Sequence, residues 1–141
     1  TGTTIQPVFP KINTPVHCVL ANPGIVVSTK DVFDCLPSFS PLDEDSYTTE
    51  QVTALENGAY DRLIDFGNDL TIPACALHPE INALLDRLLG LSRDFPSDYI
   101  GHAMSGSGGS CFCLMRSADA CARATQLLQE SGIWATATKF I

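Results

Sequence analysis

The chain has 141 residues, of which 45% are hydrophobic and 17% are charged. This composition supports a single domain with its own core and excludes a disordered chain, and no stretch approaches the roughly 18 consecutive apolar residues of a membrane helix. Sixteen acidic residues against eight basic ones give a formal charge of −8, and the basic residues are scattered singly, so nucleic acid and anionic membranes are poor partners.

The first third of the chain predicts two strands and a short helix. Residues 3–9 are rich in strand-forming residues and end at a proline, and residues 16–21 form a second apolar strand before the turn pair Pro23-Gly24. Ser28 or Thr29 then caps a short helix that runs to about Leu36.

The middle third is predicted to be helical after a loop. Residues 37–47 are interpreted as a loop, with exposed carboxylates at 43–45 that do not converge on a metal. Thr48-x-x-Gln51 has the form of a capping box that opens a helix, Gly58 interrupts it, and residues 60–66 add one or two helical turns. The clearest helix begins at Pro79 and ends near Gly90, with a core-facing stripe of Ile81, Leu84, Leu85, Leu88 and Leu89.

The last third alternates strands with one helix. Residues 99–104 and 111–115 are strands joined by a glycine-serine loop, a helix capped by Ser117 ends at Gly132, and residues 133–140 form the last strand. Without the first strand and the extra helices, the order is β-α-β-β-α-β. We therefore predict an α+β domain of the ferredoxin-like type, an antiparallel sheet with helices packed on one face.

Six cysteines raise the question of a disulfide framework or a zinc site. A chain with an ample core favours reduced, buried thiols, and the C-x-C pair Cys111 and Cys113 would point to one face of a strand. No second matched pair accompanies it, and the histidines show no ligand spacing, so no metal site is expected. The histidines are His17, His78 and His102. Reduced, buried cysteines indicate a cytoplasmic protein.

The loop between the third and fourth predicted strands carries the most chemical information. Residues 105–110 hold three glycines and three serines. Glycine permits positive φ angles, so consecutive N–H groups of such a turn can form a nest for an anion such as phosphate. The same composition also suits a flexible hairpin connection, and composition alone leaves both interpretations open.

The segment Met-Ser-Gly-Ser-Gly-Gly-Ser-Cys-Phe at 104–112 resembles the third signature motif of the GHMP kinase superfamily. Three further segments are similar to one branch of that family, in the same order along the chain. They are Asn-Pro-Gly-Ile-Val-Val-Ser-Thr at 22–29 followed by Val-Phe at 32–33, Phe-Gly-Asn-Asp-Leu at 66–70 followed by Pro-Glu-Ile at 79–81, and Trp-Ala-Thr-Ala-Thr at 134–138. This branch phosphorylates 4-diphosphocytidyl-2-C-methyl-D-erythritol in non-mevalonate isoprenoid synthesis.

The resemblance implies transfer of the γ-phosphate of ATP, with Mg²⁺, to the 2-hydroxyl of this small-molecule cytidine diphosphate substrate. Phe33 aligns with an aromatic residue that packs on the cytosine ring, and Thr29 with the same pocket wall. From the residues alone, a core position is the usual role of such an aromatic. Ser28 stands where some family members have proline. The loop that would face the transferred phosphate consists of Ser105, Gly106, Ser107, Gly108, Gly109 and Ser110.

In the family, the main ATP loop and the catalytic Asp and Lys belong to an amino-terminal domain, and none of these motifs occurs here. The chain also starts without Met. We therefore expect residues 1–141 to be a carboxy-terminal domain that has no catalytic residues, is inactive alone and works with its own amino-terminal kinase domain. Asn68 and Asp69 are predicted to be turn or cap residues rather than an acid–base or metal pair. Two alternatives stay open: a GHMP kinase of homoserine or mevalonate type, or a complete ferredoxin-like ligand-binding module.

Overall fold

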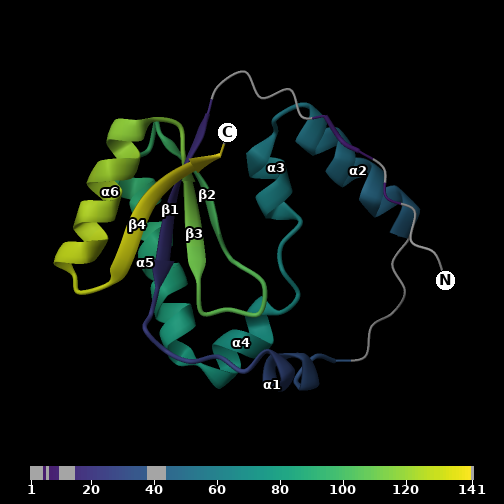
Figure 1. Ribbon diagram of the computed structural model, residues 1–141, viewed down its shortest axis with the longest axis horizontal. Coiled ribbons are helices and arrows are strands. Elements are labelled where there is room, and N and C mark those ends of the chain that lie inside the picture. The colour runs from purple at the N-terminus through teal and green to yellow at the C-terminus, as the bar shows by residue number, and fades with distance from the viewer. Residues whose placement is uncertain (1–4, 6, 10–14, 38–43, 141) are drawn as a thin grey trace.

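The computed structural model describes residues 5, 7–9, 15–37 and 44–140 (Figure 1). Its four strands form one sheet in the order β2-β3-β1-β4, with every neighbouring pair antiparallel. The strands are β1 (Val16–Asn22), β2 (Tyr99–Met104), β3 (Cys111–Met115) and β4 (Trp134–Phe140). The predicted α+β class with an antiparallel sheet is confirmed.

The inner face of the sheet is covered by two long helices, α5 (Pro79–Asp94) and α6 (Ala118–Glu130) (Figure 1). Alternate residues of the central strands point toward them, as strand geometry requires: Val19 pairs with Cys113 and Ala21 with Cys111, and all four are fully buried. The Ser117 hydroxyl accepts a hydrogen bond from the Ala120 N–H at 3.1 Å, which caps α6 as predicted. Most of the apolar core lies between this face and the two helices.

The outer face is partly covered by a short helix, α3 (Tyr60–Asp65). Val16, Cys18 and Leu114 form a small buried cluster on this face, against which Tyr60 and Ile64 pack. The approach to β2 is close, because a Cβ atom at Gly101 would lie 2.7 Å from Ile64 Cδ1. Glycine at position 101 therefore lets α3 lie directly on the sheet, opposite the two helices of the main core.

The helices of the middle third differ from the sequence-based expectations. Helix α2 (Glu44–Glu56) begins before Thr48, so residues 44–47 are helical rather than loop and Thr48-x-x-Gln51 is not a capping box at the helix start. Residues 38–43 of the expected loop lie outside the described residues. Helix α4 (Thr71–Leu77) was not predicted, because its sequence contains Pro73 and shows no clear apolar stripe.

Two further expectations need correction. Helix α5 passes through Gly90 to Asp94, and Leu89 is 46% exposed while Leu91 takes a buried position. The first predicted strand is not found: Ile5 and residues 7–9 are outside any strand, and the rest of 3–9 lies outside the described residues.

All six cysteines are free thiols, but they do not share one environment. Cys111 and Cys113 point into the same core, as the C-x-C spacing predicts, and burial raises the pKa of both thiols to about 12. Cys35 is exposed and Cys75 is half-buried, so the expectation that all six are core residues is wrong for these two.

Candidate functional site

The glycine-serine loop has a defined conformation between β2 and β3. The Ser105 N–H donates to the Ser110 carbonyl at 2.9 Å, and the Gly108 N–H donates to the Ser105 carbonyl at 3.1 Å. Gly106 and Gly108 have φ angles of +56° and +93°, which L side chains rarely adopt. A Cβ atom at Gly108 would also lie 3.0 Å from Met104 Sδ. Both positions therefore require glycine. This requirement is expected both for an anion nest and for a tight turn.

The first half of this loop presents backbone donors that remain available. Within the described part of the chain, the N–H groups of Gly106 and Ser107 donate to no acceptor. Gly106 is exposed and Ser107 is half-buried, so a ligand can reach them. This half of the loop thus presents two successive N–H donors that a ligand can reach, and successive backbone N–H groups can hold an anionic oxygen.

Helix α1 (Thr29–Asp34) stands next to this loop. The Ser28 hydroxyl accepts from the Asp31 N–H at 3.3 Å and caps the helix as predicted, while fully buried Val32 anchors it to the core. Thr29 and Phe33 are four residues apart and lie on the same side of the helix. The Thr29 and Ser107 hydroxyl oxygens lie 2.8 Å apart, so the structure brings two predicted site residues into contact.

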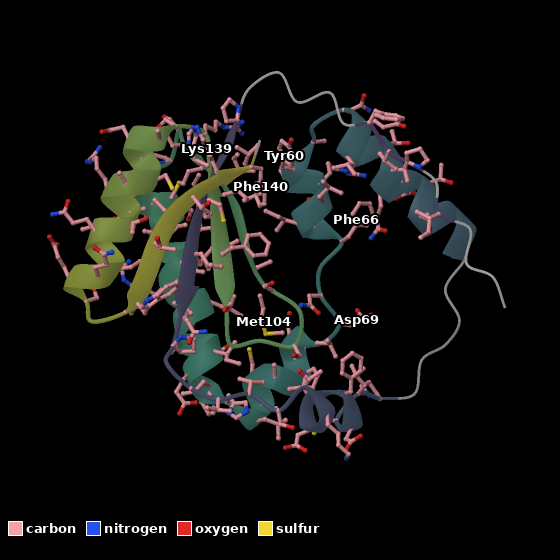
Figure 2. All side chains as sticks on the ribbon, viewed as in Figure 1. Tyr60, Phe66, Asp69, Met104, Lys139 and Phe140 are labelled. Carbon is pink, nitrogen blue, oxygen red and sulfur yellow. The ribbon has the colours of Figure 1, made fainter. Side chains whose placement is uncertain are left out.

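A cavity of about 980 Å³ lies on the outer face of the sheet, between the sheet, α3, the end of α1 and the loop. Figure 2 shows Met104 and Asp69 at one end and Tyr60 and Phe140 at the other. The cavity is lined by Phe33, Leu36, Leu55, Tyr60, Leu63, Ile64, Gly67, Asn68, Asp69, Leu70, Ala103, Met104, Ser105, Gly106, Phe112, Leu114 and Phe140. Most of these side chains are apolar, as in sites that bind the uncharged part of a ligand.

The predicted site residues are not all placed at this cavity. Phe33, Ser105 and Gly106 line it, and Phe33 is 52% exposed rather than part of the core. Gly109 is buried against Pro23, with a Cβ position 3.5 Å from that ring. The Ser110 hydroxyl accepts from Asn22 Nδ2 at 3.2 Å, so the second half of the loop is anchored to the end of β1.

Tyr60 is a cavity residue that sequence reasoning missed. Its hydroxyl is buried and has no hydrogen-bond partner within the described part of the chain, although the residue lines the cavity. Buried hydroxyls nearly always find a partner. No local sequence signal marks it, because its position follows from the docking of α3 on the outer face.

Asn68 fulfils its predicted turn role, since its Oδ1 accepts from the Leu70 N–H at 3.0 Å. Asp69 is exposed and is the only residue with a formal charge among the described residues that line the cavity. A single carboxylate does not form a divalent-cation site, and no group of three or more His, Cys, Asp and Glu gathers in the described ranges.

His102 lies outside the cavity lining. Its Nδ1 is hydrogen-bonded to the Tyr99 hydroxyl, and burial lowers the pKa of the imidazole while the charge of Asp86 opposes this effect. Burial also raises the pKa of Tyr99 to about 12. This pair is a half-buried hydrogen-bonded unit of β2.

Across residues 15–37 and 44–140, no helix combines the length and the apolar character needed to span a membrane. No protein-family model matches the chain.

Individual proteins do match it over most of its length. A 4-diphosphocytidyl-2-C-methyl-D-erythritol kinase of Granulibacter bethesdensis is 38% identical over 132 residues, which is 90% of the chain and 38% of the relative. A kinase of the same name from Bradyrhizobium is 32% identical over 142 residues, covering 94% of the chain and 44% of the relative.

A solved structure agrees with these relatives. The crystal structure of a 4-(cytidine 5′-diphospho)-2C-methyl-D-erythritol kinase superimposes with a TM-score of 0.62 at 30% identity, over 88% of this chain and 43% of that one. The chain therefore spans about two-fifths of the length of the proteins that it matches.

Proposed function

From the premise that the chain belongs to the GHMP kinase family, as a homologue of 4-diphosphocytidyl-2-C-methyl-D-erythritol kinases, we propose that it is the carboxy-terminal, substrate-side domain of such an enzyme. The whole protein would transfer the γ-phosphate of ATP to the 2-hydroxyl of the cytidyl substrate, and an amino-terminal domain would supply the catalytic residues.

One observation carries the proposal: the hydrogen bond between Thr29 and Ser107. It joins the helix that bears Phe33 to the loop that bears the N–H groups of Gly106 and Ser107, which have no acceptor among the described residues. A substrate with an aromatic base at one end and phosphates at the other needs an apolar ring and anion donors side by side. Phe33 and Gly106, which both line the cavity, supply a ring and a donor, and Ser107 adds the next N–H along the loop.

The chemistry of phosphoryl transfer assigns this domain a positioning role. Such reactions proceed by in-line displacement, and the protein contributes mainly orientation and electrostatic stabilisation. The exposed ring of Phe33 would stack on the uncharged base, and the amides of Gly106 and Ser107 would donate to an anionic oxygen. The described lining residues do not fit Mg²⁺, because Asp69 is the single carboxylate among them, so Mg²⁺ and ATP would be held by the amino-terminal domain.

The test is an acceptor assay with the intact protein that contains this chain. It would be supplied with ATP and Mg²⁺ and, separately, with 4-diphosphocytidyl-2-C-methyl-D-erythritol, R-mevalonate or L-homoserine, and formation of ADP would be followed. Of the three alcohols, we expect only 4-diphosphocytidyl-2-C-methyl-D-erythritol to be phosphorylated. Turnover only with R-mevalonate or L-homoserine would move the protein to another branch of the family.

A second arm uses the 141-residue chain by itself. Titration with cytidine diphosphate, followed by calorimetry, is expected to give at most weak binding, because only one wall of the proposed site is present. Micromolar or tighter binding by this chain alone, together with an intact protein that is inactive on all three alcohols, would favour a stand-alone binding module.

A further inference from the structure

Asn68 contacts the glycine-serine loop from the segment between α3 and α4. Its Nδ2 group donates to the Met104 carbonyl at 3.1 Å and to the Gly106 carbonyl at 2.7 Å. This segment runs beside the β2–β3 loop in Figure 1. Both hydrogens of one side-chain amide are therefore used on two carbonyls of the loop, across 36 and 38 positions of sequence.

The same side chain is itself held in place. Asn68 Oδ1 accepts from the Leu70 N–H, and Gly67 just before it has a φ angle of +76°, which turns the chain toward the loop. An amide fixed at its oxygen has little freedom to rotate, so the direction of its two N–H groups is set by the 67–70 turn. The turn thus orients the Asn68 amide so that both of its N–H groups donate to the loop.

Peptide planarity carries this orientation to the other side of the loop. The Gly106 carbonyl and the Ser107 N–H belong to one planar trans peptide, in which they point in opposite directions. Because Asn68 holds the carbonyl, it also fixes the direction of the Ser107 N–H, which is free of any acceptor in the described part of the chain. The Met104 contact acts in the same way on the Ser105 N–H, which donates to Ser110.

We propose that Asn68 is a positioning residue for phosphate transfer: it locks the loop in the form in which the Ser107 amide is available to an anionic oxygen. The identity of the anion as a transferred phosphate rests on the proposed function. The locking of the loop by Asn68 does not depend on it. Asn68 itself acts through the loop and is not a catalytic residue.

The competing explanation is that Asn68 matters only as a turn residue. Asn68→Asp separates the two roles, because aspartate has the same size and keeps the acceptor for Leu70 but removes both donors and places a carboxylate against two carbonyl oxygens. Asn82→Asp is the matched control: Asn82 is exposed on α5, and its Nδ2 contact to Asp86 is long, at 3.4 Å.

The first measurement is amide hydrogen exchange on the 141-residue chain. In Asn68→Asp, the Ser105 and Gly108 amides, which make the internal bonds of the loop, should exchange at least about tenfold faster, the effect of losing roughly two hydrogen bonds. The amides of β1 and β3 serve as the internal reference. Unchanged loop exchange, or an equal acceleration throughout the chain, would overturn the proposal, and Asn82→Asp should leave the loop unaffected.

The second measurement is the kinetics of the intact kinase with its acceptor alcohol. A misplaced amide at the transferred phosphate should lower kcat by about tenfold or more while KM for the acceptor changes less than about twofold. An unchanged kcat in a variant with a loosened loop would also overturn the positioning role. A wild-type protein that phosphorylates no acceptor would instead refute the proposed function, and the exchange result would still decide whether Asn68 locks the loop.

Discussion

Thr29 and Ser107 lie 78 positions apart in the sequence, yet their hydroxyl oxygens are 2.8 Å apart in the fold. The bond joins the first turn of α1 to the loop between β2 and β3. Either hydroxyl can donate, and the exposed position of Thr29 means that water competes for the contact. Such a bond contributes more to the local arrangement of the two segments than to the stability of the whole domain.

A double-mutant cycle measures this link. Thr29→Val and Ser107→Ala should each lower the free energy of unfolding by less than about 1 kcal/mol, and the double variant should lose less than the sum, with a coupling of about 0.5 kcal/mol. Urea unfolding of the four proteins gives the values. Strict additivity would mean that the two hydroxyls do not interact in solution.

Phe33→Ala tests the stacking role of the exposed ring. We expect the affinity of the intact kinase for its cytidyl substrate to fall by about 1–3 kcal/mol, the usual value for base stacking. Stability should change little, because about half of the side chain is already in water. Leu89→Ala is the matched control, since Leu89 is similarly exposed on α5 and away from the cavity. An unchanged KM for the cytidyl substrate would rule out the stacking role.

Tyr60→Phe removes the buried hydroxyl that has no hydrogen-bond partner among the residues the structure describes. Deletion of a satisfied tyrosine hydroxyl usually costs stability, whereas deletion of an unsatisfied one relieves a desolvation penalty. We therefore expect the free energy of unfolding to stay the same or to rise by about 1 kcal/mol. Chemical denaturation of the ligand-free chain is the measurement, and a loss above about 1 kcal/mol would show that the hydroxyl has a partner.

The buried thiols predict a loss of stability at alkaline pH. Burial raises the pKa of Cys18 to about 11 and of Cys111 and Cys113 to about 12, from an ordinary value of 9.0, with smaller contributions from neighbouring thiols. A thiol with a raised pKa in the folded state stays protonated there while the unfolded chain ionises. Its stabilising contribution is therefore complete below pH 9 and is lost as the pH rises toward 12.

Equilibrium unfolding between pH 7 and 11 checks this dependence, with Cys35→Ser as a control that should leave the profile unchanged because Cys35 is exposed. Iodoacetamide gives an independent readout: at pH 8 the native chain should be alkylated fast at Cys35 and slowly at Cys111 and Cys113. A flat stability profile up to pH 11 would show that these thiols are not buried.

Much of the ferredoxin-like fold follows from local sequence patterns. The strands at 16–21, 99–104 and 111–115 are mostly apolar runs bounded by turn residues, and Ser28 and Ser117 are recognisable helix caps that the structure reproduces. The sequence did not show which side of α1 is exposed. From the sequence alone, Phe33 would be assigned to the core, but in the structure Val32 takes the buried position and Phe33 is exposed.

The outer face of the sheet could not be predicted because it is created by tertiary packing. Helix α4 contains Pro73 and has no strong periodicity, and α2 starts ahead of the apparent capping box. The cavity exists only where α3 docks beside Gly101, which brings Tyr60 next to strands about 40 or more residues away in the chain. Asn68 was recognisable as a turn residue, but its two contacts to the loop join segments that no local pattern connects.

The cavity walls carry no cationic side chain among the described residues that line them, and the one formal charge, Asp69, is negative. Under the proposed function, a pyrophosphate meets no counter-ion on this side and must be neutralised by the opposing half of the enzyme. Recognition of the anion would then be shared, with neutral N–H donors of Gly106 and Ser107 on this side and the positive charge on the other. Cytidine diphosphate should accordingly bind this half only modestly, and closure of both halves would be needed for tight binding of the complete substrate.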